Sequence, residues 1–332
     1  MAHGLGIDIG SVAVKAAIVG PDRVLVGAWT RPIAGRPAEA VAALIREVAA
    51  AVGPATVRVG ITGSGSDLVR GAALREDETV ALARAVPVVC PDARAAIEIG
   101  GQSARLVVIE PGTHALLDYG LNQQCAAGSG SFIEQQAGRL GLGVEDFARI
   151  AAGAPRGATV AGRCSVFAKS DMIHLQQKGT PVADIAYGLC LAVARNFMAT
   201  VIRGREIPVP IAIAGGGARN PGLVRAFAEV LGIDPGSIAA SPHPGAECAV
   251  GMAVAALERA GGPEADLAGV AAALDLGDPA RHASTLAPLE VGPIPDGPAA
   301  RAAERPIRKG EGCFLGVDVG SVSTNLVVMA ED

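Results

Sequence analysis

Three glycine-rich turns, each placed after an apolar run typical of a buried strand, constrain the fold of this chain more than any other feature. They are GIDIGS at 6–11, EIGGQS at 98–103 and AGGGARN at 214–220. Glycine lets the backbone approach a ligand closely, and the amides of such a turn can line up on phosphate oxygens. The third turn also precedes a predicted helix, whose N-terminus attracts anions. The pattern predicts an α/β protein that binds a phosphorylated ligand.

Hydrophobic periodicity predicts strands alternating with helices along a chain of 332 residues, a length that suits two domains. Hydrophobic residues make up 50% of the chain but aromatic residues only 3%, so the core must be built from Ala, Val, Leu and Ile. The predicted strands lie at 5–10, 12–20, 23–30, 57–62, 95–101, 104–112, 113–120 and 207–214. The predicted helices lie at 37–52, 77–86, 129–141, 144–152, 165–178, 182–203 and 245–261, with one more after the third glycine turn.

Charge and hydropathy exclude several classes of partner. The net charge is only -5 and no Lys/Arg run stands out, so neither nucleic acid nor an anionic membrane is expected as a partner. The N-terminal MAHGLGIDIG lacks the segments of a signal peptide, and no window approaches the roughly 18 uninterrupted apolar residues of a membrane span. We therefore expect a cytoplasmic location, where the six cysteines are thiols or metal ligands before they are disulfides.

Asp8, in the first glycine turn, is a candidate ligand for a magnesium ion. A carboxylate beside a glycine turn suits magnesium, which prefers oxygen ligands and keeps part of its hydration shell, so Asp8 is predicted to hold magnesium through water. An Asp-x-Gly turn between two strands is more often only a hairpin, and the two further glycine turns shift the balance toward function. Lys15, on the next predicted strand, is not expected to reach phosphate.

Two cysteines stand directly before predicted helices, Cys125 in NQQCAAGSGSF and Cys164 in GRCSVFAKSD, 39 residues apart. A helix N-terminus favours thiolate, although a lone cysteine there is usually only a small packed residue. Iron–sulfur clusters generally need four cysteines, and this chain has no CxxC pair. A symmetric dimer would supply four ligands from these two positions. The predicted core cysteines are Cys90, Cys190 and Cys248.

The three turns resemble the phosphate-1, phosphate-2 and adenosine motifs of the superfamily of actin, sugar kinases and heat-shock chaperone ATPases. That resemblance implies a ribonuclease H-like fold, with two related α/β domains around a cleft that binds ATP and magnesium. CAAGSGSF and CSVFAKSD, with ITGSG at 61–65, further resemble the activator ATPases of 2-hydroxyacyl-CoA dehydratases and the ATPase subunits of benzoyl-CoA reductase over about 5–258.

This second resemblance implies a function. It implies a homodimer in which Cys125 and Cys164 of both protomers hold one 4Fe-4S cluster, and an ATP-gated electron transfer to an acyl-CoA dehydratase or reductase. A ferredoxin or flavodoxin donor is implied as well.

The resemblance also implies a role for residues of each turn. Asp8 and Glu98 would be the catalytic carboxylates, with Asp8 also at magnesium. The nucleotide would be contacted by Gly10, Ser11, Gly100, Gly101, Gln102, Gly215, Gly216, Gly217 and Asn220. The second turn departs from the family's D-I-G-G-Q-D pattern, because Glu98 and Ser103 replace two aspartates. ATP binding is therefore implied more strongly than ATP turnover.

Two other functions stay open. A small-molecule kinase of the same superfamily would need an aspartate base near the cleft, whereas Asp118, Asp146 and Asp171 lie in helical or loop-like settings. A non-catalytic ATP-sensing module would suit the altered second turn. Iron and sulfide content separates the activator from both alternatives, and ATPase assays with and without a hydroxyl acceptor separate a kinase from a sensor.

Near the C-terminus, GVDVGSVST at 316–324 repeats the pattern of GIDIGSVAV at 6–14. Large fused members of the resembled family carry two ATPase units, so the repeat is expected to begin a second unit that this chain does not contain. Its strand is expected to dock poorly or to pair on an exposed sheet edge. The predicted divisions are a first α/β subdomain at 1–104, a second at 105–245, a closing helix at 246–261, a linker at 262–311 and the second repeat at 312–332.

Overall fold

A computed structural model describes residues 2–69, 74–122, 128–161, 165–274, 306–319 and 324–331. Cys125 and Cys164 lie outside these residues. The chain divides into two compact units, Met1–Asp278 and Pro279–Asp332, and each is described by itself.

The first sheet of the larger unit has the strand order β11-β4-β1-β2-β3, with β5 also paired to β4. Its strands are β1 (His3–Ile9), β2 (Ala13–Val19), β3 (Leu25–Pro32), β4 (Thr56–Thr62), β5 (Leu74–Arg75) and β11 (Ala265–Asp266). Helices α1 (Pro37–Val52) and α9 (Leu267–Ala273) cover one face, where Leu5, Ile7 and Ile9 are fully buried. Strand β1 is antiparallel to β2 and parallel to β4. The carboxyl end of β1 therefore lies beside both the turn into β2 and the loop that follows β4.

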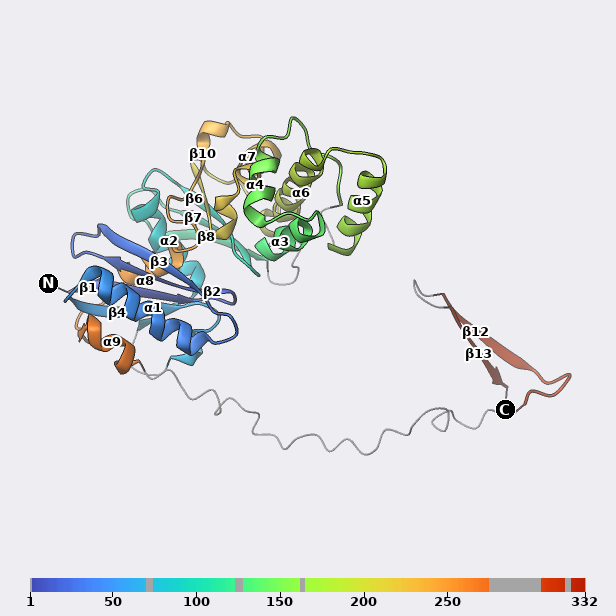
Figure 1. Ribbon diagram of the computed structural model, residues 1–332, viewed down its shortest axis with the longest axis horizontal. Coiled ribbons are helices and arrows are strands. Elements are labelled where there is room, and N and C mark those ends of the chain that lie inside the picture. The colour runs from blue at the N-terminus through green and yellow to red at the C-terminus, as the bar shows by residue number, and fades with distance from the viewer. Residues whose placement is uncertain are drawn as a thin grey trace. The chain divides into compact units, whose positions relative to one another are not determined.

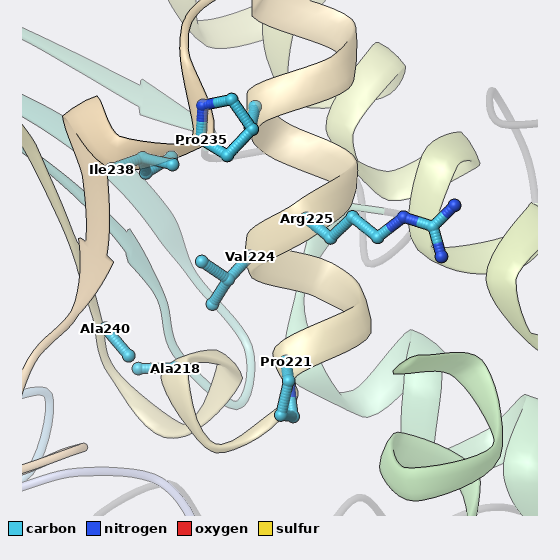
Figure 2. Close-up of a pocket in the computed structure, with 8 residues that line it drawn as sticks. Ala218, Pro221, Val224, Arg225, Pro235, Ile238 and Ala240 are labelled. Atoms are coloured by element: carbon cyan, nitrogen blue, oxygen red, sulfur yellow. The ribbon is translucent and has the colours of Figure 1, made fainter. Parts of the chain in front are cut away.

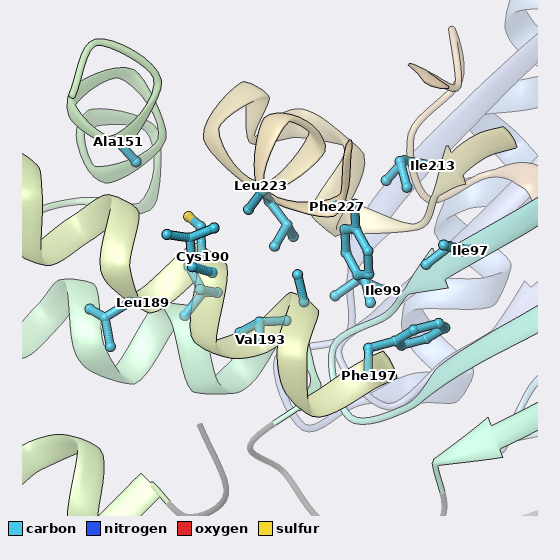
Figure 3. Packing of buried hydrophobic residues seen from close by; sticks show 14 of the residues in the cluster. Ile97, Ile99, Ala151, Leu189, Cys190, Val193, Phe197, Ile213, Leu223 and Phe227 are labelled. Carbon is cyan, nitrogen blue, oxygen red and sulfur yellow. The ribbon is translucent and has the colours of Figure 1, made fainter. Parts of the chain in front are cut away.

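The second sheet has the order β10-β9-β6-β7-β8. Its strands are β6 (Ala95–Ile99), β7 (Ala104–Ile109), β8 (Leu116–Asn122), β9 (Ile211–Ala214) and β10 (Ile238–Ala240). The helices of this half are α3 (Gly130–Arg139), α4 (Val144–Ala152), α5 (Ser165–Gln177), α6 (Val182–Phe197) and α7 (Pro221–Leu231), grouped in Figure 1. Their core joins Phe197 edge-to-face with Phe227 at 5.4 Å between ring centroids, beside Ile97 and Ile99 of the sheet (Figure 3).

Helices α2 (Glu78–Val89) and α8 (Glu247–Glu258) fill the layer between the two sheets. One side of this layer packs on Ala17 and Val19 of the first sheet, and the other on Ala96 and Val107 of the second. Helices and sheets therefore alternate in layers through the larger unit, as Figure 1 shows. The close approach depends on glycine, because a Cβ at Gly6 would lie 2.5 Å from a backbone nitrogen of α8.

Local signals explain several helix ends. Asp77 caps α2 by accepting from Thr79 N, and Asn220 caps α7 by accepting from Leu223 N. Helix α7 begins with Pro221 and ends before Gly232, which adopts the left-handed conformation that favours glycine. Helix α6 continues into one π-helical turn, η3 (Met198–Ile202).

Among the described residues, the segment Val182–Ile202 is long and apolar enough to suit a membrane span. Because 78% of its apolar window is buried inside the protein, it is a core helix.

Two predicted boundaries differ from the structure. The predicted linker at 262–311 begins too early, since β11 and α9 belong to the larger unit and Leu267 and Val270 are buried against α1. Strand β6 pairs with β9 in the second sheet, so the division after residue 104 falls inside that sheet rather than before it.

The smaller unit contains a hairpin of β12 (Cys313–Val319) and β13 (Thr324–Ala330). Its register repeats that of β1 and β2: Asp318 faces Asn325 where Asp8 faces Lys15. The hairpin forms a two-stranded sheet of its own. Its apolar side chains are exposed on both faces, among them Phe314, Leu315, Val317, Leu326, Val327, Val328 and Met329.

Candidate functional site

Asp8 and Lys15 meet at the end of the β1–β2 hairpin. Lys15 Nζ lies 2.9 Å from Asp8 Oδ2, and the two residues face each other across the strand pair. A Cβ at Gly10 would lie 2.8 Å from Lys15 Nζ, so the ammonium group lies against the phosphate-1 turn. Lys15 is thus turned toward Asp8 rather than into solvent, while the expectation that it does not reach phosphate stays a prediction. The second Asp8 oxygen, Oδ1, is buried and has no hydrogen-bond partner among the described residues.

Burial and pairing set the protonation of these two groups. Burial raises the pKa of Asp8, while the charge of Lys15 opposes that rise. Burial lowers the pKa of Lys15, but the attraction of Asp8 outweighs it and the pKa lies above its ordinary value. Lys15 is therefore a firmly charged cation at the turn. A buried carboxylate oxygen without a partner suits a magnesium-bound water, so the residues present fit the predicted ion.

The segment ITGSG at 61–65 packs against the end of β1. Gly63 has a φ of 98° and a Cβ there would lie 2.5 Å from Asp8 Oδ1, a position that requires glycine. Gly65 N donates to the Ile9 carbonyl oxygen at 2.8 Å. Because Gly63 has no side chain, the loop leaves space beside Asp8 Oδ1.

The phosphate-2 turn lies opposite the phosphate-1 turn. Gly100 N donates to the Ser103 carbonyl oxygen at 2.9 Å, which closes the turn and leaves Gly101 and Gln102 exposed. A Cβ at Gly101 would lie 3.1 Å from Val12 Cγ2, so the two turns touch through Val12. The first and second glycine turns of the sequence are thus brought together.

Glu98 is held by a buried arginine. Arg105 faces Glu98 across β6 and β7, and its Nε lies 2.6 Å from Glu98 Oε2 as an ion pair without aligned hydrogen-bond geometry. The same guanidinium donates to Glu78 at 2.7 Å. Burial raises the pKa of Glu98 to about 7, although Arg105 opposes the shift. The predicted catalytic role of Glu98 stays a prediction, and the Arg105 partner lay outside the sequence analysis.

The adenosine turn lies against the end of β6. Gly215 has a φ of 75°, and a Cβ there would lie 2.6 Å from the Ile99 carbonyl oxygen. Glu247, at the start of α8, fixes this turn by accepting from Gly215 N at 3.2 Å and Gly245 N at 2.8 Å. Burial raises the pKa of Glu247. Sequence reasoning missed Glu247, because Gly215, its partner in the adenosine turn, lies 32 residues away along the chain.

Asn220, predicted near the nucleoside, is buried and uses its side chain inside the protein. Its amide oxygen accepts from Leu223 N at 3.1 Å, and its Nδ2 lies 3.7 Å from Cys190 Sγ. The structure therefore gives Asn220 a helix-capping role, and its predicted nucleoside contact stays a prediction.

An apolar cavity of about 320 Å³ lies between α7 and β10. Figure 2 shows Val224 and Pro221 of the helix on one side and Ile238 on the other, with Ala218 and Ala240 at one end. Arg225 lies over the Tyr187 ring, 4.1 Å from its centroid. Ala218 belongs to the adenosine turn, whereas no residue of the two phosphate turns lines the cavity.

The helices next to the two predicted cluster cysteines are described, although Cys125 and Cys164 are not. Helix α5 begins at Ser165, directly after Cys164, and α3 begins five residues after Cys125, at Gly130. The start of α5 matches the prediction, whereas α3 begins one residue after the predicted 129 and does not directly follow Cys125. No group of three metal-ligating side chains occurs within the described residues. Cys190 and Cys248 are buried, which confirms these two as core thiols, while Cys90 is half-buried and packs against the core from its edge.

Comparison with known proteins decides the family. Residues 5–256 match the BadF/BadG/BcrA/BcrD ATPase family. The chain belongs to this family. Within it, the chain is 30% identical over 264 residues to the (R)-2-hydroxyglutaryl-CoA dehydratase activating ATPase of Acidaminococcus fermentans, covering 77% of this chain and 97% of that relative. It is also 30% identical over 258 residues to the activator of lactoyl-CoA dehydratase of Anaerotignum propionicum, covering 77% and 98%.

A solved structure of this ATPase family shares the fold. The activator of the 2-hydroxyisocaproyl-CoA dehydratase from Clostridium difficile, with bound ADPNP, matches at a TM-score of 0.68 and 26% identity. The match covers 77% of this chain and 94% of that one. The actin-like α/β fold predicted from the glycine turns is confirmed.

Proposed function

We propose that this protein is an ATP-dependent activator that passes a low-potential electron to an acyl-CoA dehydratase or reductase, gated by ATP binding and hydrolysis. The observation that carries the proposal is the Asp8–Lys15 pair at the phosphate-1 turn, which the phosphate-2 turn touches through Val12, in a chain that matches named dehydratase activators over nearly their full length. A buried carboxylate, a charged lysine and exposed turn amides are the groups that a magnesium nucleotide needs.

Within this proposal, each turn has a task. Lys15 and the amide of Ser11 bind phosphate oxygens beside Gly10, whose own amide donates to the Ala13 carbonyl oxygen, and Asp8 Oδ1 receives the magnesium hydration shell. The amides after Gly100, together with Gln102, bind the next phosphate. Glu247 holds the turn of Gly215, Gly216 and Gly217 in shape beside the nucleoside. Glu98 would orient water at this site, and its pKa of about 7 leaves it able to exchange a proton near neutrality.

Cys125 and Cys164 are proposed to hold the 4Fe-4S cluster together with the same residues of a second protomer. Support comes from their places before α3 and α5 and from the family match. The bound cluster supplies one electron at low potential. The homodimer, a ferredoxin or flavodoxin donor and a cytoplasmic location belong to the same proposal. The names of relatives support a dehydratase partner, and a benzoyl-CoA reductase subunit of Thauera aromatica is a further match.

Iron analysis tests the proposal. Anaerobically purified protein should contain iron and sulfide at about four each per dimer, and Cys125→Ala and Cys164→Ala should each lose them. Cys90→Ala is the control, because this half-buried thiol lies at the end of α2 and packs against the core between the two sheets. An iron-free dimer after anaerobic reconstitution, or full iron in Cys125→Ala, would overturn the cluster. ATPase assays with and without a hydroxyl acceptor then separate the activator and sensor from a kinase.

We also propose that hairpin β12–β13 is the phosphate-1 hairpin of a second ATPase unit. Its register repeats that of β1–β2, and its two apolar faces are exposed where the faces of β1–β2 are covered by helices. Deleting residues 279–332 should leave the unfolding temperature of the larger unit unchanged. A marked fall would mean that the hairpin stabilises the larger unit, against this proposal.

A further inference from the structure

The first turn of α3 is hydrogen-bonded to the phosphate-2 turn. Gly130 N donates to the Gly100 carbonyl oxygen at 2.7 Å, and Ser131 N donates to the Gly101 carbonyl oxygen at 2.9 Å. The Ser131 hydroxyl donates to the same Gly101 oxygen at 2.5 Å. These bonds use amides at a helix start that have no partner within the helix. They join the turn to the helix that follows the Cys125 segment.

The two accepting carbonyls belong to the peptide units whose amides form the phosphate-2 turn. Gly100 C=O shares a peptide plane with Gly101 N–H, and Gly101 C=O shares one with Gln102 N–H. Since a trans peptide is planar, its N–H and C=O point in opposite directions and rotate together. No acceptor within the described residues meets the amides of Gly101 and Gln102. One side of each plane is thus bound to α3, while the other is free for a phosphate oxygen.

A phosphate on these amides would therefore act on α3 through the same two planes. Turning a plane to suit a phosphate oxygen also turns the carbonyl that holds Gly130 or Ser131. Bonds in such a chain polarise one another, so a charged acceptor on the N–H side strengthens the bond on the C=O side. The backbones of Gly130 and Gly100 are in close contact, because a Cβ at Gly130 would lie 3.0 Å from the Gly100 oxygen.

Within the described part of the chain, the Ser131 hydroxyl adds a side-chain bond to this link. Its hydroxyl also lies 3.2 Å from the Ser129 hydroxyl, within the same turn. The two backbone bonds persist whatever the side chain, so Ser131 Oγ is the part of the link that the sequence can vary.

We propose that Ser131 is a positioning residue that ties α3 to the phosphate-2 turn, so that a nucleotide bound at Gly101 and Gln102 orders the first turn of α3. The inference rests on the proposed function for the identity of the ligand. Ser131 does not touch the nucleotide, and it acts through the Gly101 carbonyl.

Hydrogen exchange on the full chain tests this link without requiring the cluster. Amide exchange over residues 128–139 is measured with and without a non-hydrolysable ATP analogue and magnesium, at a concentration that saturates each variant. Wild type and Ser131→Thr, which keeps the hydroxyl, should show slower exchange with nucleotide. Ser131→Ala should lose about fivefold of that protection, the effect of one hydrogen bond. Because coupling is reciprocal, its nucleotide Kd should rise by a similar factor.

Ser237→Ala, in a 3₁₀ turn outside the site, is the control and should behave as wild type. Equal protection in Ser131→Ala and wild type would overturn the inference. So would unchanged α3 exchange in a wild-type protein that calorimetry shows to bind nucleotide. Absence of nucleotide binding by wild type would instead reject the proposed function, and the inference would fall with it.

Discussion

The packing of β1 on α8 gives a sharp stability prediction at Gly6. A Cβ placed on Gly6 lies 2.5 Å from the Ala253 backbone nitrogen and closer still to the Ala249 carbonyl oxygen. Backbone atoms of a helix cannot rotate away, so Gly6→Ala must push α8 from the sheet. Overpacking typically costs about 1–3 kcal/mol, and we expect about 3 kcal/mol here because the clash is with backbone. For a unit of this size, that cost lowers the unfolding temperature by roughly 6–12 °C.

Gly316 is the matched control, because it occupies the same register position in hairpin β12–β13. A Cβ there would meet nothing closer than the Val327 carbonyl oxygen at 3.7 Å, an ordinary contact. Gly316→Ala should therefore leave thermal and urea unfolding of the larger unit unchanged. The packing argument would be refuted if Gly6→Ala unfolded within about 0.5 kcal/mol of wild type, the range of ordinary surface changes.

Two further changes probe the charged pairs of the site. Lys15→Met removes the cation beside Asp8. The Kd for ATP should rise about tenfold, which is the effect of losing one charged hydrogen bond. An unchanged Kd in calorimetry would exclude a contact between Lys15 and phosphate. Burial raises the pKa of Glu98 from 4.5 to about 7. Between these two pH values the folded protein keeps a proton that the unfolded chain releases. The free energy of unfolding therefore falls as pH rises from 4.5 to about 7. Glu98→Gln should remove that fall, by at most about 1.4 kcal/mol per pH unit, and urea unfolding with parallel pH profiles for both proteins would contradict the shift.

Local sequence signals predicted most of the fold. The glycine turns after apolar runs correctly marked the ends of β1, β6 and β9, because turn chemistry and strand periodicity act over a few residues. The helices predicted at 129–141 and 165–178 correspond to α3 and α5 within a few residues at each end. Helix α9 was missed because its Ala/Gly-rich segment carries only Leu267 and Val270 as buried apolar residues. Their spacing of three was the available signal.

Side-chain pairing was harder to predict than the turns. Lys15 and Arg105 both face an acid across a hairpin, Asp8 and Glu98 respectively, so correct strand register would have found both pairs. Glu247 had no such signal. Its carboxylate meets Gly215 only because α8 packs between the two sheets, and that contact spans 32 residues of chain.

The two repeated hairpins are not interchangeable, despite their shared register. Phe314 stands where Gly4 lies, and a Cβ at Gly4 would already lie 3.0 Å from Leu257 Cγ and closer to the α8 backbone. A phenylalanine ring cannot fit there, so β12–β13 cannot replace β1–β2 against α8. The chemistry differs as well, because Asp318 faces the neutral Asn325, whose Nδ2 lies 3.4 Å from Asp318 Oδ2. Hairpin β12–β13 thus carries the acid without a facing cation, whereas β1–β2 carries both the acid and the cation.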